Sequence, residues 1–328
     1  MNVLVTGSSG LIGTALLRRL STGGHRVTRL VRRPTDHPRG AAAPTPSVPM
    51  TATTPTTPTT TTDVHWDPSQ GVIDLDGLED AGPFDGVVHL AGAGIGDKRW
   101  SPPRKQAVLD SRTDSTELLV ASLLQLAPRP PVLVSGSAVG YYGDGGDHQL
   151  TEESPQGSGF LAEVCGRWER AASPALDAGI RTVNLRSGIV LSTAGGALAK
   201  QLPLFKLGLG GTLGRGTQYQ SWITLDDEVE VILRALVDGS LSGPVNATAP
   251  TPVTNGELSA AIARAVGRRC RISVPKTALR FVLGTEMADE MLLSGQRAMP
   301  ARLTASGYDF AYPDIDAALR AVLAPGAA

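Results

Sequence analysis

The sequence has few cysteines, few aromatic residues, no surplus of positive charge and no long apolar run. Its two cysteines, Cys165 and Cys270, lack metal-ligand spacing, so we expect neither a disulfide framework nor a metal site. The formal net charge of −1 argues against a nucleic-acid partner, because neutralising phosphates requires a basic surplus. No apolar run approaches the roughly 20 residues that span a bilayer, so we also expect no membrane partner.

The start of the chain carries no pattern of a secretory signal. Met1–Thr6 runs straight into a strand pattern without the charged region of a signal peptide, so we expect a cytoplasmic protein. Hydrophobic residues make up 41% of the 328 residues and aromatic residues 4%, so the core must consist mainly of Leu, Val, Ile and Ala. We expect a monomer or homodimer of one large or two modest domains that acts on a small-molecule substrate.

Short apolar runs alternate with helical patterns through the first half of the chain. This alternation predicts an α/β fold: a Rossmann-like, doubly wound parallel sheet with helices on both faces. The predicted strands are Asn2–Thr6, Arg26–Val31, Val87–Leu90, Pro131–Val134 and Arg181–Leu185, and the predicted helices are Leu11–Ser21, Pro103–Leu126 and Phe160–Leu176.

Two segments depart from this alternation. Residues 35–62 are nearly all Thr, Pro, Ala and Gly, so we expect a disordered surface insertion, with the sheet resuming at Val64–Trp66. Beyond Leu191 the chain is glycine-rich and then helical, which indicates a smaller C-terminal α/β lobe. We expect a Rossmann domain over 1–190 and the lobe over 191–328, and we leave open that they share part of the sheet.

A glycine-rich turn joins the first predicted strand to the first predicted helix. Residues without a Cβ permit a tight turn, close approach of the backbone to a pyrophosphate and close packing of helix on strand. The helix N-terminus then offers free N–H groups to phosphates. The alternative is a purely structural glycine turn. The candidate cofactor residues here are Gly7, Ser9, Gly10, Leu11, Ile12 and Gly13.

The end of the second strand indicates which dinucleotide binds. NAD enzymes usually have Asp or Glu there to hold the ribose hydroxyls, whereas this chain has Val31 followed by Arg32 and Arg33. Two guanidinium groups can hold a 2′-phosphate, so we expect NADP(H) in preference to NAD(H). The alternative is that both arginines are solvated loop residues. Leu90, Ala91 and Gly92 end the Val87–Leu90 strand with small residues at the expected ligand side of the sheet.

Several ordered motifs resemble those of an extended short-chain dehydrogenase/reductase. They include the glycine turn, Leu90-Ala91-Gly92, Ser135-Gly136-Ser137-Ala138, Tyr141-Tyr142-Gly143, Lys98-Arg99-Trp100, Ser111-Arg112, Arg186–Leu191, Gly208–Asp227 and Leu293–Arg297. Together they are similar to the atypical group called epimerase family proteins, which are related to NAD-dependent epimerases and dehydratases and end in a segment called DUF1731. The resemblance implies that Arg32, Leu90, Ala91 and Arg112 line the NADP site and that Ile189 lies near the nicotinamide. An ordinary helix-surface arginine is the alternative for Arg112.

The acid–base residues of that family are incomplete here. The resemblance implies a Ser, a Tyr and a Lys around the substrate oxygen, and Ser137 matches the serine. Aligned on Glu169, the Tyr position holds Leu161 and the Lys position holds Cys165, and neither can serve. Tyr142 or Tyr141 is a candidate to supply the missing hydroxyl, or alternatively packs beside the cofactor.

The substrate region also departs from the sugar-nucleotide enzymes of this fold. The position of their diphosphate-binding arginine holds Gln220, which argues against a nucleotide-sugar substrate. Lys98 either meets an anionic substrate or is a solvated charge, and Trp222 either walls the cleft or lies in the core. The candidate substrate-binding residues are Lys98, Trp100, Arg215, Gln218 and Trp222.

Two functions are consistent with these residues. One is an NADPH-dependent oxidoreductase or epimerase-like enzyme that acts on a small carbonyl or hydroxyl compound through Ser137 and a relocated acid such as Tyr142. The other is a non-catalytic NADPH-binding sensor or scaffold that has lost the chemistry of the missing Tyr and Lys.

Overall fold

A computed structural model describes residues 1–32 and 61–324. Its centre is an eight-stranded sheet whose strands are β1 (Asn2–Thr6), β2 (Arg26–Val31), β3 (Thr61–Asp67), β4 (Val72–Ile73), β5 (Gly86–His89), β6 (Val132–Ala138), β8 (Arg181–Ser187) and β13 (Gly243–Ala247). They lie in the order β13-β8-β6-β5-β1-β2-β3-β4, and all pairs are parallel except β3 with β4. The predicted α/β fold with a parallel sheet is confirmed.

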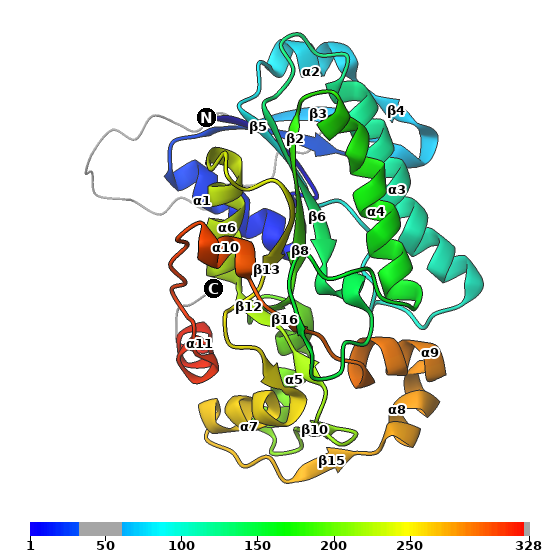
Figure 1. The fold of residues 1–328 in the computed structure, drawn as a ribbon, viewed down its shortest axis with the longest axis vertical. Helices are drawn as coiled ribbons and strands as arrows, with labels where there is room; N and C mark the ends of the chain where they lie inside the picture. Colours follow the sequence, from blue (N-terminus) through cyan, green and yellow to red (C-terminus); the bar gives the residue numbers. More distant parts are fainter. Residues whose placement is uncertain (33–60, 325–328) are drawn as a thin grey trace, which may run out of the picture.

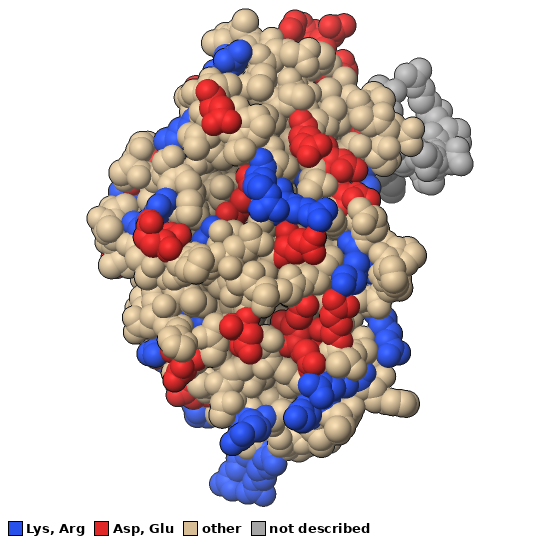
Figure 2. Space-filling view, turned by 45° about the vertical axis from the view of Figure 1, so that its right-hand side comes forward, with Lys and Arg blue, Asp and Glu red and all other residues tan. Residues whose placement is uncertain are grey.

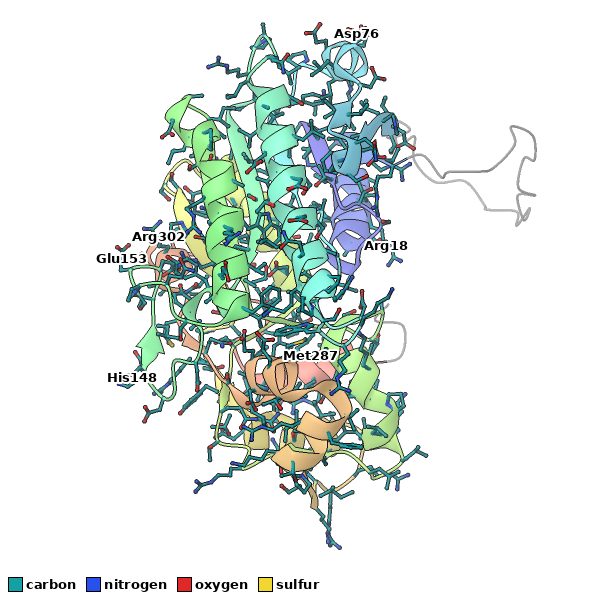
Figure 3. All side chains as sticks on the ribbon, turned by 90° about the vertical axis from the view of Figure 1, so that its right-hand side faces the viewer. Arg18, Asp76, His148, Glu153, Met287 and Arg302 are labelled. Carbon is teal, nitrogen blue, oxygen red and sulfur yellow. The ribbon has the colours of Figure 1, made fainter. Side chains whose placement is uncertain are left out.

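Helices cover both faces of this sheet (Figure 1). One face packs against α1 (Leu11–Thr22) and α6 (Leu225–Val237), and the other packs against α2 (Leu75–Ala81), α3 (Pro102–Leu123) and α4 (Phe160–Asp177). Two aliphatic cores result, one on each side of the strands. Figure 3 shows α3 and α4 side by side over the sheet. The strands that feed these cores are buried on both faces, as expected for a covered parallel sheet.

A smaller lobe lies beyond the carboxyl ends of the strands, at the lower end of Figure 1. Its core contains Trp222, Phe205 and Leu319. Its helices are α5 (Gly196–Lys206), α7 (Asn255–Ala265), α8 (Lys276–Leu283), α9 (Thr285–Ala288) and α11 (Ile315–Val322), while α10 (Ala301–Ala305) packs against β13. Its short strands pair as β9 (Ile189–Leu191) with β12 (Trp222–Thr224), β10 (Gly211–Leu213) with β15 (Ile272–Val274), and β11 (Tyr219–Gln220) with β14 (Val253–Thr254).

Smaller elements complete the two regions. The strand β7 (Gln149–Leu150) pairs with β16 (Arg297–Ala298), and the single-turn helices are η1 (Pro68–Gln70), η2 (Val139–Tyr142) and the π-helical η3 (Asp289–Leu293). The main sheet takes β13 from the part of the chain beyond residue 190, so the sequence order does not divide the two regions cleanly. Among the described residues, no helix is both long and apolar enough to cross a bilayer.

The predicted insertion at 35–62 ends too late. Thr61 and Thr62 belong to β3 and pair with Val27 and Thr28 of β2, so the backbone hydrogen bonds of the sheet override the loop-like composition of these two threonines. The rest of that prediction, 35–60, lies outside the described residues.

Candidate functional site

A cleft of about 1020 Å³ opens at the carboxyl ends of β1, β2 and β5. This is the side of an open parallel sheet at which ligands bind, next to the point where the strand order reverses. Strand ends form one wall, and residues 107–115 in the middle of α3 form another. The predicted cofactor residues that line it are Gly7, Ser9, Gly10, Arg32, Leu90, Ala91 and Gly92, and they are joined by Ser8, Arg29–Val31, Trp66–Ser69, Ala93, Ala107, Asp110, Ser111, Asp114 and Ser115.

The turn between β1 and α1 has no room for side chains at two of its glycines. Gly7 has a φ of +67°, and a Cβ there would lie 2.5 Å from the backbone of Leu90. A Cβ on Gly13 would lie 2.2 Å from the Gly7 carbonyl oxygen. The helix begins after Gly10 with no side-chain cap, so the first N–H groups of α1 are left to a ligand in the cleft. The geometry is that of a pyrophosphate-binding turn.

The adenosine end of the cleft carries two arginines in different situations. Arg29 forms a bidentate pair with Asp63, with nitrogen–oxygen distances of 2.6 and 2.7 Å. Arg32 lies just beyond the end of β2 and lines the cleft opposite η1. The pKa of the Asp67 carboxyl is lowered mainly by a hydrogen bond from Ser69 and in part by the charge of Arg32. Arg33, the second predicted phosphate ligand, lies outside the described residues.

Arg112 does not line the cleft but supports its floor. Its guanidinium donates to the carbonyl oxygens of Ala93 and Val108, each at 3.0 Å, and lies 5.0 Å from the Trp168 ring. A Cβ on Gly92 would lie 3.2 Å from its Cζ. Burial lowers the pKa of this guanidinium. Arg112 therefore ties α3 to the segment that follows β5, and its role at the cofactor, which the resemblance implies, stays a prediction.

His89 is the other buried ionisable group under the cleft. Its ring bonds the hydroxyls of Thr6 at 2.7 Å and Thr116 at 2.9 Å. Burial, reinforced by the charge of Arg112, lowers its pKa to about 3. The imidazole is thus neutral at physiological pH and positions the ends of β1 and β5.

Four other predicted cofactor residues also lie outside the lining of the cleft: Gly13, described above, and Leu11, Ile12 and Ile189. Ile12 packs against the core between α1 and the sheet. Leu11 lies against Gly195, whose added Cβ would meet it at 3.4 Å, so the start of α5 contacts the start of α1. Ile189 pairs with Trp222 in the small sheet of the lobe.

Ser137, the predicted catalytic serine, already has a partner. Its hydroxyl donates to Glu169 Oε1 at 2.7 Å. Both carboxylate oxygens of Glu169 are also held by Arg186 at 2.8 Å. The two charged side chains are 12% and 3% exposed, so this is a buried ion pair directly behind Ser137. The serine can accept a further hydrogen bond, but its hydrogen is directed at a carboxylate.

Tyr142 is held by the same network. Its hydroxyl donates to Asn246 Oδ1 at 2.7 Å and accepts from Arg186 Nη1 at 3.0 Å. Burial raises the pKa of this phenol. The Tyr141 ring lies 3.5 Å from the Arg186 guanidinium carbon, in a cation–π contact. Both tyrosines therefore pack around Arg186, and the Tyr142 hydrogen is directed at Asn246.

The positions of the missing Tyr and Lys lie on α4 beside this network. A Cβ on Gly140 would meet the Cβ of Leu161 at 3.4 Å, so Leu161 fills its position with hydrocarbon. Cys165 is buried, and burial, followed by the nearby Glu169 charge, raises the pKa of its thiol to about 11. A neutral thiol cannot lower the pKa of a neighbouring hydroxyl as an ammonium would.

The predicted substrate residues do not converge on one described pocket. Trp222 is fully buried and donates its Nε1–H to the Thr251 carbonyl, so its role is in the core and the prediction of a cleft wall is wrong. Trp100 stacks edge-on against Phe160 at 4.8 Å. Gln218 donates to the carbonyls of Leu213 and Leu292. The remaining two, Lys98 and Arg215, are exposed.

The sequence analysis did not identify the residues that hold Ser137, Tyr142 and the start of α4 in place. Glu169 served only to align the helix, Arg186 was named only as the first residue of a motif, and Asn246 was not named. The C-terminal segment also contributes, because the Glu290 carboxylate accepts from the Phe160 and Leu161 amides at 2.9 and 2.8 Å and so caps α4. Such partners are 17 to 130 positions apart in the chain, and no local pattern connects them.

One further buried carboxyl lies at the start of α6. Glu228 accepts a hydrogen bond from the Ser187 hydroxyl at 2.6 Å, and its second oxygen has no partner among the residues described. Burial raises its pKa to about 7. Within the described parts of the chain, no group of three His, Cys, Asp or Glu side chains could hold a metal ion.

Two family models and several known proteins match this chain. Residues 3–247 match the model of the NAD dependent epimerase/dehydratase family, and residues 274–322 match a domain of unknown function, DUF1731. The chain is 43% identical to the epimerase family protein Mb2239 of Mycobacterium bovis, over 97% of this chain and 96% of that protein. It is 35% identical to the human epimerase family protein SDR39U1, over 99% of this chain and all of that protein.

A solved structure is similar over almost the whole chain. The crystal structure of human epimerase family protein SDR39U1 (isoform 2) with NADPH has a TM-score of 0.82 and 32% identity, and the match covers 98% of this chain and 99% of that one.

Proposed function

The chain belongs to the NAD dependent epimerase/dehydratase family, and from that premise we propose that it binds NADPH and responds to it without the acid–base catalysis of short-chain dehydrogenases. The observation that carries this proposal is the contrast between an open nucleotide cleft and a filled catalytic position. The cleft has a free helix N-terminus at Gly10 and Arg32 at its adenosine end. The human relative was crystallised with NADPH.

The preference for NADPH rests on the chemistry at the end of β2. A 2′-phosphate needs a cation where a ribose hydroxyl would need a carboxylate. Val31 ends the strand, Arg29 is paired with Asp63, and Arg32 lines the cleft. Charge-assisted bonds from a guanidinium to a phosphate are among the strongest hydrogen bonds in proteins.

The absence of turnover rests on the donors around Ser137. A reduction needs a group that gives a proton to the substrate oxygen. Ser137 and Tyr142 direct their hydrogens to Glu169 and Asn246. Leu161 and Cys165 replace the usual Tyr and Lys. We therefore expect a sensor or scaffold whose state depends on the bound dinucleotide.

Titration calorimetry with NADPH and NADH tests the nucleotide part. In the Arg32→Ala variant, NADPH affinity should fall by roughly 10- to 100-fold, because one charge-assisted contact is worth about 1.5–3 kcal/mol. NADH affinity should stay within about threefold, since NADH lacks the phosphate. Arg26→Ala is the matched control, because Arg26 is exposed at the opposite end of the same strand. Equal losses for both nucleotides would contradict the assignment of Arg32.

A second candidate is favoured by one observation, the Ser137 hydroxyl bonded to a carboxylate. In an alcohol dehydrogenase reaction Ser137 would take the proton of a substrate hydroxyl and pass it to Glu169, while the hydride goes to bound NADP⁺. Arg186 holds both oxygens of Glu169 at 2.8 Å, which fixes the carboxylate within hydrogen-bond distance of the Ser137 hydroxyl. An assay distinguishes the enzyme from the sensor: the protein is mixed with a panel of alcohols or carbonyl compounds and the dinucleotide, and the NADPH absorbance is followed. Turnover that Ser137→Ala reduces roughly 100-fold or more would establish the enzyme and rule out the sensor.

A further inference from the structure

The charge of the C-terminal lobe is strongly asymmetric. Between Leu258 and Thr285 the sequence has six Lys and Arg residues and no Asp or Glu. Two of the six, Arg264 and Arg280, pair with Asp316 and Asp289. The whole chain has 30 Lys and Arg against 31 Asp and Glu, so the rest of the chain has 24 against 31. A near-neutral total hides one basic region on an otherwise acidic protein.

The unpaired basic residues gather at one end of the molecule. Arg268 donates its Nε–H to the Lys206 carbonyl at 3.0 Å, which brings the end of α5 against the α7–β15 loop. Figure 2 shows Lys and Arg side chains gathered at the lower end, where Figure 1 places β15 and α8. We call the following five exposed residues the basic end, and none forms an ion pair with a residue in the described parts of the chain: Lys206, Arg268, Arg269, Arg271 and Lys276.

The helix that follows turns its uncharged face outward. Thr277, Ala278, Phe281 and Val282 are exposed, and their spacing of one, four and five residues places them on a single face of α8. Phe281 is 85% exposed and Val282 is 68% exposed. The opposite side carries Arg280, which pairs with Asp289 and fixes the orientation of the helix. An amphipathic helix normally buries the face that α8 leaves in solvent.

Other large apolar side chains surround the basic end. Leu207 and Leu209 follow α5 and are 71% and 56% exposed, and Ile272 of β15 is 38% exposed. Ile272 pairs with Gly211 of β10, two residues after Leu209. Exposed apolar side chains that cluster in this way mark an interaction surface. Here they lie within a few residues of unpaired cations.

From this combination we propose that the lobe docks on an anionic lipid bilayer through α8 and the basic end. Apolar side chains beside lysines and arginines meet both requirements of an anionic membrane surface, the acyl boundary and the charged headgroups. A nucleic acid would use the cations but not Phe281 and Val282, and an apolar protein interface would exclude five unpaired cations from its centre. The acidic remainder of the chain is repelled by the same headgroups, so the lobe faces the membrane.

This surface departs from the expectation of no membrane partner, and the physical reason is simple. That expectation rested on net charge and on the length of apolar runs, which are properties of the whole chain. A docking surface depends on where a few side chains lie. It needs no long apolar run, because the chain lies on the bilayer instead of crossing it.

Vesicle flotation with the full chain tests the proposal. We expect at least about tenfold more protein on vesicles that contain about 30 mol% phosphatidylglycerol than on pure phosphatidylcholine vesicles. Raising the salt from about 0.05 to about 0.5 M should release it. The charge variant Arg269→Glu with Arg271→Glu should lower binding roughly tenfold or more, because each cation at an anionic surface strengthens binding roughly fivefold. The apolar variant Phe281→Ser with Val282→Ser should also lower binding roughly tenfold or more, because it removes the apolar area that would enter the acyl boundary.

Matched controls separate this surface from general effects. Arg18→Glu changes an exposed charge on α1 (Figure 3), and Val237→Ser changes a 64% exposed valine on α6. Both should bind vesicles like the wild type, and all variants should keep the wild-type melting temperature. Equal binding to neutral vesicles, no binding to either kind, or unchanged binding by the Phe281/Val282 variant would overturn the proposal. So would a dimer in size-exclusion chromatography that this variant dissociates, or tighter binding of the basic end to DNA or RNA oligonucleotides than to vesicles.

Discussion

The adenosine end of the site and the region around Ser137 are built in opposite ways. The first is an open cleft that Arg32 lines, and the neighbouring glycine turn leaves the first N–H groups of α1 without a side-chain cap. The second is filled by side chains that satisfy one another, from Ser137 through Glu169 and Arg186 to Tyr142. Dinucleotide binding needs unsatisfied N–H groups, whereas proton transfer needs a free donor. The proposed function rests on this difference, because Ser137 and Tyr142 direct their hydrogens to Glu169 and Asn246.

The largest effect is expected in the open region. Gly13→Ala places a Cβ 2.2 Å from the Gly7 carbonyl oxygen, so the turn must open and α1 must move away from β1. NADPH affinity should fall by roughly a hundredfold or more, as measured by calorimetry. Gly239→Ala is the control, because a Cβ there has nothing within 4 Å. Unchanged binding by Gly13→Ala would show that the turn does not hold the pyrophosphate.

Substitutions in the network around Ser137 should lower the free energy of unfolding and leave NADPH affinity unchanged. Arg186→Met leaves Glu169 charged and buried, which costs about 3–5 kcal/mol of unfolding free energy, measured by urea unfolding. Adding Glu169→Gln should restore part of the loss, since the uncompensated charge is gone. Arg167→Ala, which breaks an exposed pair with Glu163, should cost less than about 0.5 kcal/mol. Loss of NADPH binding at full stability would instead place Arg186 in the nucleotide site.

Glu228 should make the free energy of unfolding depend on pH. Its pKa is raised from 4.5 to about 7 in the folded protein, so the folded chain keeps a proton that the unfolded chain loses above pH 4.5. Stability therefore falls with rising pH from about 4.5 to 7 and then levels off. Glu228→Gln removes this penalty and should stabilise by roughly 3 kcal/mol at pH 8, with no gain below pH 4.5.

Urea unfolding across a pH series measures this difference. The control is Glu230→Gln on the same helix, whose carboxylate is 45% exposed and pairs with Arg19. It should show no pH-dependent gain. A constant difference between wild type and Glu228→Gln at all pH values would mean that Glu228 ionises normally.

The smallest expected effect is a difference in stability between variants of the neighbouring residues Tyr141 and Tyr142. Tyr142→Phe leaves Asn246 Oδ1 and one Arg186 N–H without a partner, at a cost of about 1–2 kcal/mol. Tyr141→Phe should change stability by less than about 0.5 kcal/mol, because Tyr141 contacts Arg186 through its ring. Thermal unfolding measures both. A larger loss for Tyr141→Phe would reverse the assignment of the network.

Local patterns in the sequence predicted much of the fold. The strands Asn2–Thr6 and Arg26–Val31 and the start of α1 at Leu11 lie where the apolar runs and glycines place them. The predicted family and its DUF1731 segment are confirmed as well. These features depend on residues close together in the chain, whose spacing fixes their conformation.

The partners of individual side chains were not predictable in the same way. Trp222 carries no local signal that separates a core residue from a cleft wall, and its burial follows from packing of α7 and α11 around it. The bond from Tyr142 to Asn246 joins β13 to the single-turn helix η2, 104 positions earlier. Such contacts follow from the tertiary arrangement, so the closure of the region around Ser137 becomes visible only in three dimensions.

A crystal structure of this chain with NADPH tests the contrast most directly. The account predicts the 2′-phosphate on Arg32 and the pyrophosphate on the amides after Gly10, with Ser137 still bonded to Glu169 and Tyr142 still bonded to Asn246. A Tyr142 hydroxyl turned toward the nicotinamide, or adenosine bound away from Arg32, would contradict it.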